Sequence, residues 1–544
     1  MRNLTDRMNT GNGVAYTILG AILILTLFLR LYGIDWGLPT PLHPNYSYHP
    51  DETALLTISQ WLARGGLHEK EFIYGGTFYF VILRACAYFG NIFHEFIGGA
   101  NALANAILAA RYLQVFIALL TMLIIYECGR LLYDRKTGLI AALILAVAPA
   151  HIITTQTVRP DAISAFLVTL AVLMAAKLLK SESSSRTKLL MYSGITIGTL
   201  AAFRLPLIGF GLLPILGYII AQQRTNGGAF RKLVFDRNVF WLALVVVLTY
   251  AVLSPHTFIH PEWFMAGLKV TAKFETTAFP DAVDRGPVFF QYAWRLLHQA
   301  LGYPGYFLAV GGVAYALVQR RAENMIVLVG FGLYFIMLAA VTWTVVRYTL
   351  PMLPLLALLG GVAASRIIEL MHPVYARGIT YIIGGFFLAW TLAADIALLH
   401  VEASKNVRVL SSEWITENLP SDKSILVIKS YLEEDFFNPV VPPPHRVSAA
   451  FLINGSDSRR LFAPQMFDYL VLHELLYADM ERLGERHPRK EVSEFYENMK
   501  SAKLTLVKEY KVPFEFLDID FSGWFEAVDF LVINPGIRIY QNVR

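Results

Sequence analysis

The chain has 544 residues, of which 56% are hydrophobic and only 16% are charged. An average soluble protein is roughly 45–50% apolar and about 25% charged, so this composition excludes a single water-soluble globular domain. The formal net charge of +5 does not indicate a nucleic-acid partner, because the Lys and Arg residues form short clusters between apolar runs. We interpret these clusters as signals of membrane topology.

Apolar runs long enough to cross a bilayer recur along the first 400 residues. A spanning helix needs about 20 such residues, and the sequence predicts a polytopic α-helical membrane protein with about eleven of them. The predicted spans, some slightly short, are residues 14–34, 108–128, 137–156, 162–180, 188–203, 205–221, 238–254, 301–318, 325–343, 349–365 and 378–399. No small-residue cleavage site follows the first run, so we expect it to stay as a membrane anchor.

The basic clusters predict the orientation of these spans. If the N-terminus lies in the cytoplasm, most clusters between spans also lie there, as the positive-inside rule requires. Residues 1–400 then form a membrane module with two long extracytoplasmic loops, 35–107 and 255–300. Residues 401–544, where helix-like and strand-like segments alternate, form a predicted extracytoplasmic α/β domain. Its candidate strands are 424–428, 469–472, 504–507 and 530–533, and its candidate helices are 406–418 and 491–499.

Two motifs place acidic residues at predicted helix starts in the outer part of the chain. His49-Pro50-Asp51-Glu52 opens the first candidate helix of the first outer loop, and Arg159-Pro160-Asp161 leads into the fourth span. Proline and acids in a first turn are also ordinary helix-start chemistry, and Arg159 can simply pair with Asp161. An acid at the membrane surface needs water, a metal or a cation nearby. Two such sites facing one cavity can alternatively bind a metal or a sugar, or activate a hydroxyl.

Two arginines at outer helix ends oppose the positive-inside bias. Arg204 lies between two short apolar runs, and Arg347 heads the run Arg347-Tyr348-Thr349-Leu350-Pro351. The planar donor fork of arginine suits phosphate oxygens, so both are candidate phosphate ligands; the alternative is contact with lipid headgroups. His256, near another outer helix end, is a further candidate, although no metal-ligand spacing surrounds it.

Taken in order, these residues resemble the polyprenyl-phosphate-dependent GT-C glycosyltransferases. The resemblance is greatest to relatives of the protein O-mannosyltransferases and the lipid A aminoarabinose transferases. It rests on His49-Pro50-Asp51-Glu52 in a long first outer loop, Tyr112 to Tyr133 leading into Asp134-Arg135-Lys136-Thr137-Gly138, Pro149, Arg159-Pro160-Asp161, Arg347-Tyr348 with Pro351 and Pro354, and Glu413 to Pro420 at the start of the outer domain. The resemblance implies a GT-C fold in a prokaryotic plasma (inner) membrane, with the active site and the C-terminal domain outside the cytoplasm.

The resemblance also implies roles for individual residues. Asp51 becomes the catalytic carboxylate, with Glu52 beside it and Asp161 as the second acid. Arg347 and Tyr348 are expected to meet the donor phosphate. Independently of the resemblance, Arg204 and Arg159 are further candidate phosphate ligands, and His49 and His256 are additional site candidates. The aminoarabinose transferases carry a Glu-Lys-Pro-Pro stretch where this chain has Tyr74 to Tyr79, so their metal ligand does not transfer. A divalent cation therefore stays an unassigned candidate cofactor.

The function expected from these features is transfer of a sugar from a polyprenyl-phosphate donor to an acceptor hydroxyl, with inversion and with an aspartate as general base. The acceptor would be a lipid, a glycan or a protein. A secondary transporter or lipid flippase is the main alternative, although we find no pair of related halves in the sequence. A non-catalytic subunit that binds a sugar or a lipid is the other.

Overall fold

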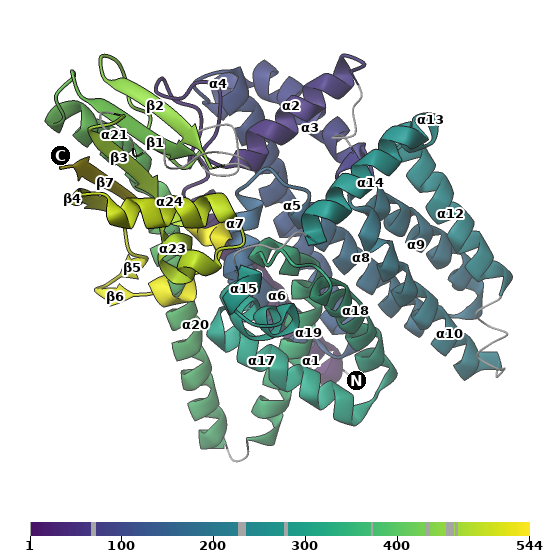
Figure 1. The fold of residues 1–544 in the computed structure, drawn as a ribbon. Coiled ribbons are helices and arrows are strands. Elements are labelled where there is room, and N and C mark those ends of the chain that lie inside the picture. Colours follow the sequence, from purple (N-terminus) through teal and green to yellow (C-terminus); the bar gives the residue numbers. More distant parts are fainter. Residues whose placement is uncertain are drawn as a thin grey trace.

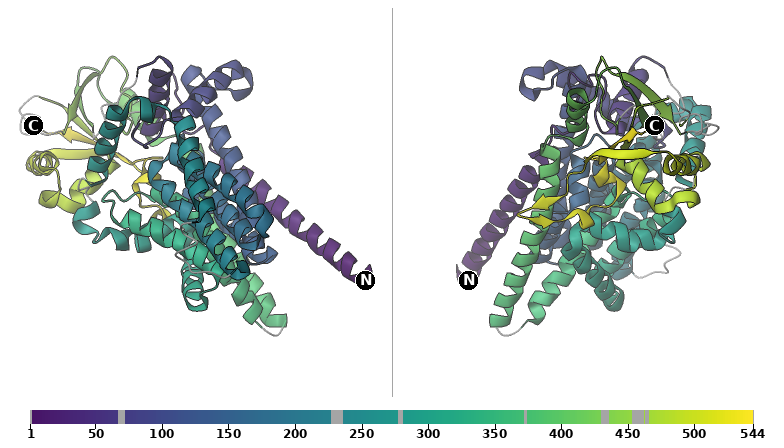
Figure 2. Two further views of the ribbon diagram at one scale, coloured as in Figure 1. Left: turned by 90° about the vertical axis from the view of Figure 1, so that its right-hand side faces the viewer. Right: turned by 60° about the vertical axis from the view of Figure 1, so that its left-hand side comes forward.

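The computed structural model describes residues 2–66, 72–226, 236–276, 281–371, 374–429, 436–452, 462 and 466–543. Long helices dominate the chain up to about residue 400, and a mixed sheet follows in the C-terminal part (Figure 1). Figure 2 shows that the free end of α1 and the sheet lie at opposite ends of the molecule. The first outer loop lies at the same end as the sheet (Figure 1).

Eight helical segments are long and apolar enough to cross a membrane, and a bent pair makes a ninth, among the residues that the structure describes. The helices that form them are α1 (Arg2–Leu31), α5 (Ala102–Leu132), α6 (Arg135–Ala146) with α7 (Pro149–Thr155), α8 (Asp161–Lys180), η2 (Leu205–Gly211) with α10 (Leu212–Asn226), α16 (Val288–Phe290) with η3 (Gln291–Leu296) and α17 (Leu297–Gln319), α18 (Ala322–Ala339), η4 (Val346–Met352) with α19 (Leu353–Leu370), and α20 (Val374–Ala403).

Three predicted spans differ from this description. The run 137–156 is not one straight helix, because α6 and α7 meet at an angle of 61° just before Pro149. The runs 188–203 and 238–254 form α9 (Ser183–Phe203) and α12 (Arg237–Leu253), which are not among the eight apolar segments. α12 has only 17 residues, and α9 opens with the polar residues Ser183 to Lys188. Figure 1 shows the two helices side by side, with α9 between α12 and α8.

Short helices fill the two outer loops. The first loop contains α2 (Pro50–Ala63), α3 (Phe78–Ile92) and α4 (His94–Ile97), so the candidate helix that His49-Pro50-Asp51-Glu52 opens is present. The second contains α13 (His256–Ile259), α14 (Pro261–Thr276) and α15 (Asp281–Asp284). α2 begins as its sequence indicates: Pro50 takes the first position, and the His49 side chain accepts a hydrogen bond from the Asp51 N–H.

The C-terminal residues form a five-stranded sheet in the order β2-β1-β3-β7-β4. β1 (Ser424–Lys429) pairs in parallel with β2 (Arg446–Phe451) and β3 (Tyr469–His473), whereas β7 (Ile537–Asn542) pairs antiparallel with β3 and β4 (Leu504–Tyr510). The remaining elements are α21 (Val407–Asn418), α23 (Glu474–Leu483), η5 (Gly484–Arg486), α24 (Lys490–Ser501), β5 (Glu515–Phe516), β6 (Ile519–Asp520), η6 (Ser522–Trp524) and α25 (Val528–Leu531). The predicted helices and three of the four predicted strands are confirmed.

The fourth predicted strand, 530–533, is wrong. Val528 to Leu531 form the short helix α25, and the turn after it docks onto the first outer loop. The Ile533 carbonyl accepts hydrogen bonds from the Trp36 indole (3.0 Å) and from Asn406 (2.9 Å), and the Val532 carbonyl accepts one from Arg408 (2.9 Å). These carbonyls are satisfied by side chains and need no neighbouring strand.

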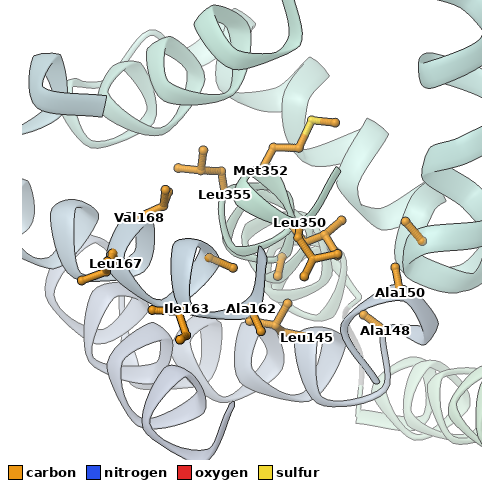
Figure 3. Packing of buried hydrophobic residues seen from close by; sticks show 14 of the residues in the cluster. Leu145, Ala148, Ala150, Ala162, Ile163, Leu167, Val168, Leu350, Met352 and Leu355 are labelled. Atoms are coloured by element: carbon orange, nitrogen blue, oxygen red, sulfur yellow. The ribbon is translucent and has the colours of Figure 1, made fainter. Parts of the chain in front are cut away.

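A continuous apolar core underlies the helix ends that carry the predicted site. Figure 3 shows Leu145 of α6 together with Ala162, Ile163 and Val168 of α8, packed near Leu350 of η4. The buried side chains of α25, such as Phe530, belong to the same cluster. The start of α8, η4 and the C-terminal domain are therefore fixed relative to one another.

Candidate active site

Most of the charged residues predicted for the site come together in one chain of contacts. Asp51 in the first turn of α2 forms an ion pair with Arg159, whose Nε donates to Asp161 Oδ2 at 3.0 Å. Arg204 Nη1 donates to the other oxygen of Asp161 at 2.6 Å. The expected pairing of Arg159 with Asp161 is thus present, and the contacts also reach Asp51 and Arg204.

The solvent exposure of the side chains differs sharply along this series of contacts. The Asp161 side chain is fully buried and those of Arg159 and Arg204 are 6% and 11% exposed, whereas that of Asp51 is 38% exposed. A buried carboxylate is stable only when it is paired, and Asp161 has two guanidinium partners. Asp51 is the carboxylate of this group that solvent or a substrate can reach.

Aromatic rings connect this group to the second predicted arginine. The Arg204 guanidinium lies 4.7 Å from the centre of the Tyr348 ring, and that of Arg347 lies 5.8 Å from the same ring and 4.6 Å from the Trp343 ring. Rings at these distances stabilise a cation by their quadrupole. Arg204, Arg347 and Tyr348 therefore form a compact group around one ring.

Arg347 has a partner that the sequence did not indicate. Its Nη1 donates to Asp529 Oδ1 at 2.9 Å, and Asp529 Oδ2 accepts from the Val346 N–H at 2.7 Å. Asp529 belongs to α25, so the C-terminal domain supplies an acid to the site. Arg347 Nε is buried and has no hydrogen-bond partner among the residues described. The guanidinium thus keeps a donor for another acceptor.

Glu52 is placed differently from Asp51, although the two are adjacent. Its Oε2 accepts from Ser47 Oγ at 2.5 Å and from Arg111 Nη2 at 2.7 Å. Its Oε1 accepts from Arg111 Nε and from the Val158 N–H, both at 2.9 Å. Neither the Glu52 nor the Arg111 side chain is exposed. Both Glu52 oxygens are therefore occupied, and the residue is tied to the turn before Arg159; its predicted catalytic role stays a prediction.

The two candidate histidines have different surroundings. His49 caps α2, and burial, followed by the charges of Arg159 and Arg347, lowers its pKa well below 6.5. A neutral ring is what its acceptor role toward the Asp51 N–H requires. His256 opens α13 in the second outer loop, close to Tyr250 and Thr257, which share a hydrogen bond of 3.1 Å. A role of His256 in the site stays a prediction.

The segment that departs from the aminoarabinose transferases packs directly against the turn that carries Arg204. The Leu205 N–H donates to the Tyr74 carbonyl at 2.9 Å. A Cβ on Gly76 would lie 2.3 Å from the Ala202 carbonyl oxygen, and Gly75 has a φ of +74°. Only glycine allows both features. Burial and the charge of Asp161 raise the pKa of the Tyr74 phenol, so it stays protonated beside the site.

A divalent cation does not fit these residues. Asp51, Asp161 and Asp529 each face a guanidinium, and the pairs leave no set of carboxylates converging on one point. Within the described ranges, no group of three or more His, Cys, Asp or Glu side chains could hold a metal ion.

Comparisons with known proteins agree with the architecture. Residues 93–258 match the family model described as dolichyl-phosphate-mannose-protein mannosyltransferase. The oligosaccharyltransferase of Archaeoglobus fulgidus, solved with a tethered acceptor peptide, has a similar structure: the TM-score is 0.50 at 13% identity, over 88% of this chain and 72% of that one. ArnT from Cupriavidus metallidurans, solved with undecaprenyl phosphate, gives a TM-score of 0.49 at 13% identity, over 86% and 95%. No curated protein matches the sequence.

The family-model match and the similarity to the Archaeoglobus oligosaccharyltransferase confirm the predicted resemblance. The family model covers the part of the chain that carries Arg159, Asp161 and Arg204, and the structural similarity extends over most of the chain. The protein is similar to the dolichyl-phosphate-mannose-protein mannosyltransferases and has the GT-C fold of the polyprenyl-phosphate-dependent glycosyltransferases.

Proposed function

We propose that the protein transfers a sugar from a polyprenyl-phosphate donor to an acceptor hydroxyl, at the membrane face that carries the C-terminal domain. One observation carries the proposal: Asp51, a half-exposed carboxylate, is joined through Arg159 and Asp161 to Arg204, which shares the Tyr348 ring with Arg347. Transfer from a lipid-linked sugar phosphate requires a carboxylate near the reacting sugar and positive charge around the phosphate. The name of the matching family model supports a donor of this class.

Arg347 and Arg204 are the proposed ligands of the donor phosphate. Both flank Tyr348 at the outer end of apolar helices, where a phosphate on a polyprenyl chain would lie. Arg347 Nε has no partner among the described residues and can donate to a phosphate oxygen. The Tyr348 ring lies between these two guanidinium groups and holds them near one place. Arg159 serves Asp51 and Asp161 in this scheme and acts on the phosphate only through its charge.

Asp51 is the proposed general base. Its Oδ2 faces Arg159, and Oδ1 has no partner in the parts of the chain described. As the acceptor oxygen attacks the anomeric carbon, Asp51 takes the hydroxyl proton. A new carbon–oxygen bond forms, the bond from that carbon to the phosphate oxygen breaks, and its electron pair leaves with the polyprenyl phosphate. Direct displacement of this kind inverts the anomeric centre.

Charge stabilisation and positioning supply most of the proposed rate enhancement, because phosphate is already a good leaving group. Negative charge that develops on the leaving phosphate is offset by Arg347 and Arg204, whose burial strengthens the interaction. Asp161 and Asp529 keep both guanidinium groups in place between turnovers.

The test is a transfer assay with the purified protein in lipid nanodiscs. Radiolabelled polyprenyl-phosphate sugars and a membrane extract of acceptors are supplied to wild type, Asp51→Asn and Asp422→Asn. Asp422 is an exposed acid in the C-terminal domain and provides the matched control. We expect Asp51→Asn to lose about 10²- to 10⁴-fold in transfer rate, the usual contribution of a general base.

Equal transfer by Asp51→Asn and Asp422→Asn would overturn the role of Asp51. If wild type transferred none of the donors and instead moved them across the bilayer of proteoliposomes, the proposal would fail in favour of a flippase.

A further inference from the structure

A cavity of about 490 Å³ lies beside the proposed phosphate site, and the catalytic scheme does not use it. Its walls come from the second outer loop, the start of α17 and the segment around η6. The lining residues that carry its chemistry are Arg285, Gln291, Trp294, Arg295, Tyr303 and Glu526. Small-molecule sites have volumes of roughly 300–1,000 Å³, so this space can hold one or two sugar rings.

The cavity combines aromatic faces with fixed polar groups. His298 stacks on Tyr303 with ring centres 4.5 Å apart, and Trp524 meets Tyr303 edge-on at 4.9 Å. Trp294 is 63% exposed on a segment that is apolar enough to cross a membrane, so its ring is open to lipid or to a ligand. The arginines and the glutamate add two positive charges and one negative charge. Ring faces suit the C–H faces of sugars, and the polar groups suit hydroxyls and an anion.

Two hydrogen bonds tie the walls of the cavity to the segments that hold Arg347. Thr344 donates to Gln291 Oε1 at 3.1 Å, three residues before Arg347. The Ala527 N–H donates to Gln299 Oε1 at 2.9 Å, two residues before Asp529. The cavity walls are therefore hydrogen-bonded to the same two segments that carry Arg347 and Asp529. A ligand in the cavity would be held at a defined position relative to the donor phosphate.

We propose that this cavity binds the acceptor, and that the bound part is a saccharide unit bearing an anionic group, either phosphate or carboxylate. This proposal rests on the transfer function described above. Arg295 and Arg285 bind the anion, Trp294 and Tyr303 pack against the sugar ring, and Glu526 accepts hydrogen bonds from its hydroxyls. The cavity holds a part of the acceptor away from the hydroxyl that reacts.

The first test measures binding alone, so that it does not depend on catalysis. Full-length Asp51→Asn protein in phosphatidylcholine nanodiscs is titrated by calorimetry with glucosamine 6-phosphate, glucuronic acid, glucose and an acidic hexapeptide. We expect the two anionic sugars to bind at least 10-fold more tightly than glucose or the peptide. Binding of the peptide or of glucose with equal affinity would overturn the proposed ligand class.

Variants then locate the site. Arg295→Gln removes a charge-assisted interaction and is expected to weaken binding of the tighter anionic sugar by about 10- to 100-fold. Trp294→Ala should weaken it, and Trp294→Phe should restore most of the affinity; the exposed position of Trp294 makes misfolding from this change unexpected. Arg321→Gln, an exposed arginine at the start of α18, is the matched control. Unchanged affinity in Arg295→Gln and Trp294→Ala would place the ligand elsewhere.

A kinetic arm separates failure of this inference from failure of the proposed function. In the transfer assay, Arg295→Gln should raise KM for the acceptor and leave the affinity for undecaprenyl phosphate unchanged. Loss of donor affinity instead would assign the cavity to the donor and overturn the acceptor proposal. If wild type binds the anionic sugars but transfers nothing, the cavity remains a saccharide site and the transfer function fails.

Discussion

Two acid–arginine centres at the start of α2 use adjacent residues in opposite ways. Glu52 and Arg111 form a sealed pair in which both side chains have 0% exposure and every carboxylate oxygen has a donor. Asp51 and Arg159 form a pair that is open on one side. The sealed centre holds the backbone in place, because the Val158 N–H and the Ile34 carbonyl are bound to it. The open centre has a side that a substrate can reach.

The largest expected effect is on stability, when the sealed centre is broken. Removing one partner of a buried ion pair leaves an uncompensated charge and typically costs about 3–5 kcal/mol. Arg111→Ala should therefore lower the thermal unfolding midpoint in detergent much more than Asp51→Ala, which leaves Arg159 paired with Asp161. Similar shifts for the two variants would mean that the two centres do not differ in the way described.

Next in size is the effect of removing a proposed phosphate ligand. Arg347→Ala should weaken binding of undecaprenyl phosphate by about 10- to 100-fold, because a hydrogen bond to a charged group contributes roughly 1.5–3 kcal/mol. Arg321→Ala is the control. Since Arg347→Ala also leaves Asp529 without its cation, the double variant Arg347→Ala/Asp529→Asn shows whether the loss comes from phosphate contact or from the stranded acid. Restored affinity in the double variant would contradict direct phosphate binding.

A smaller effect is expected when only the positioning of Arg347 is disturbed. Asp529→Asn keeps a side-chain acceptor but loses the charge that pairs with Arg347. We expect a loss of donor affinity of about 10-fold or less, on the order of 1 kcal/mol for one hydrogen bond. The value of kcat at saturating donor should change little. A large fall in kcat with unchanged donor affinity would instead indicate that Asp529 takes part in the chemical step.

The smallest effect concerns a sealed group in the C-terminal domain. His473 ends β3 in a fully buried position, and burial lowers its pKa from 6.5 to about 3. Below pH 6.5 the unfolded chain binds a proton that the folded chain does not, so the stability is complete above pH 6.5 and is lost as the pH falls toward 3. Between pH 7.5 and 5.5 we expect a loss of about 1 kcal/mol.

Hydrogen exchange of the β3 amides, corrected for the intrinsic pH dependence of exchange, measures this loss. His473→Leu should remove most of the pH dependence, because a leucine in the same apolar surroundings does not titrate. The same slope in both proteins would assign the acid sensitivity to another group.

The sequence predicted local features well, because helices, caps and apolar runs depend on neighbouring residues. The helix-start motifs singled out Asp51, Arg159 and Asp161, which the structure brings into contact, and their catalytic roles stay a prediction. The sequence could not separate the role of Asp51 from that of Glu52, since that difference depends on Arg111, 59 residues away. Asp529 was missed because no local pattern marks a residue that pairs across 182 positions. Gly75 and Gly76 were a usable signal, since adjacent glycines often mark a close backbone approach.

The pairing of Arg347 with Asp529 has a consequence for how the protein is made. Arg347 lies in the membrane module, and its counter-charge belongs to α25, 182 residues later. On the predicted topology, a ribosome must finish that stretch and the translocation machinery must deliver it to the outer face before the pair can form. The site would therefore be completed late in biosynthesis, and an unfinished chain in the membrane would lack an assembled donor site.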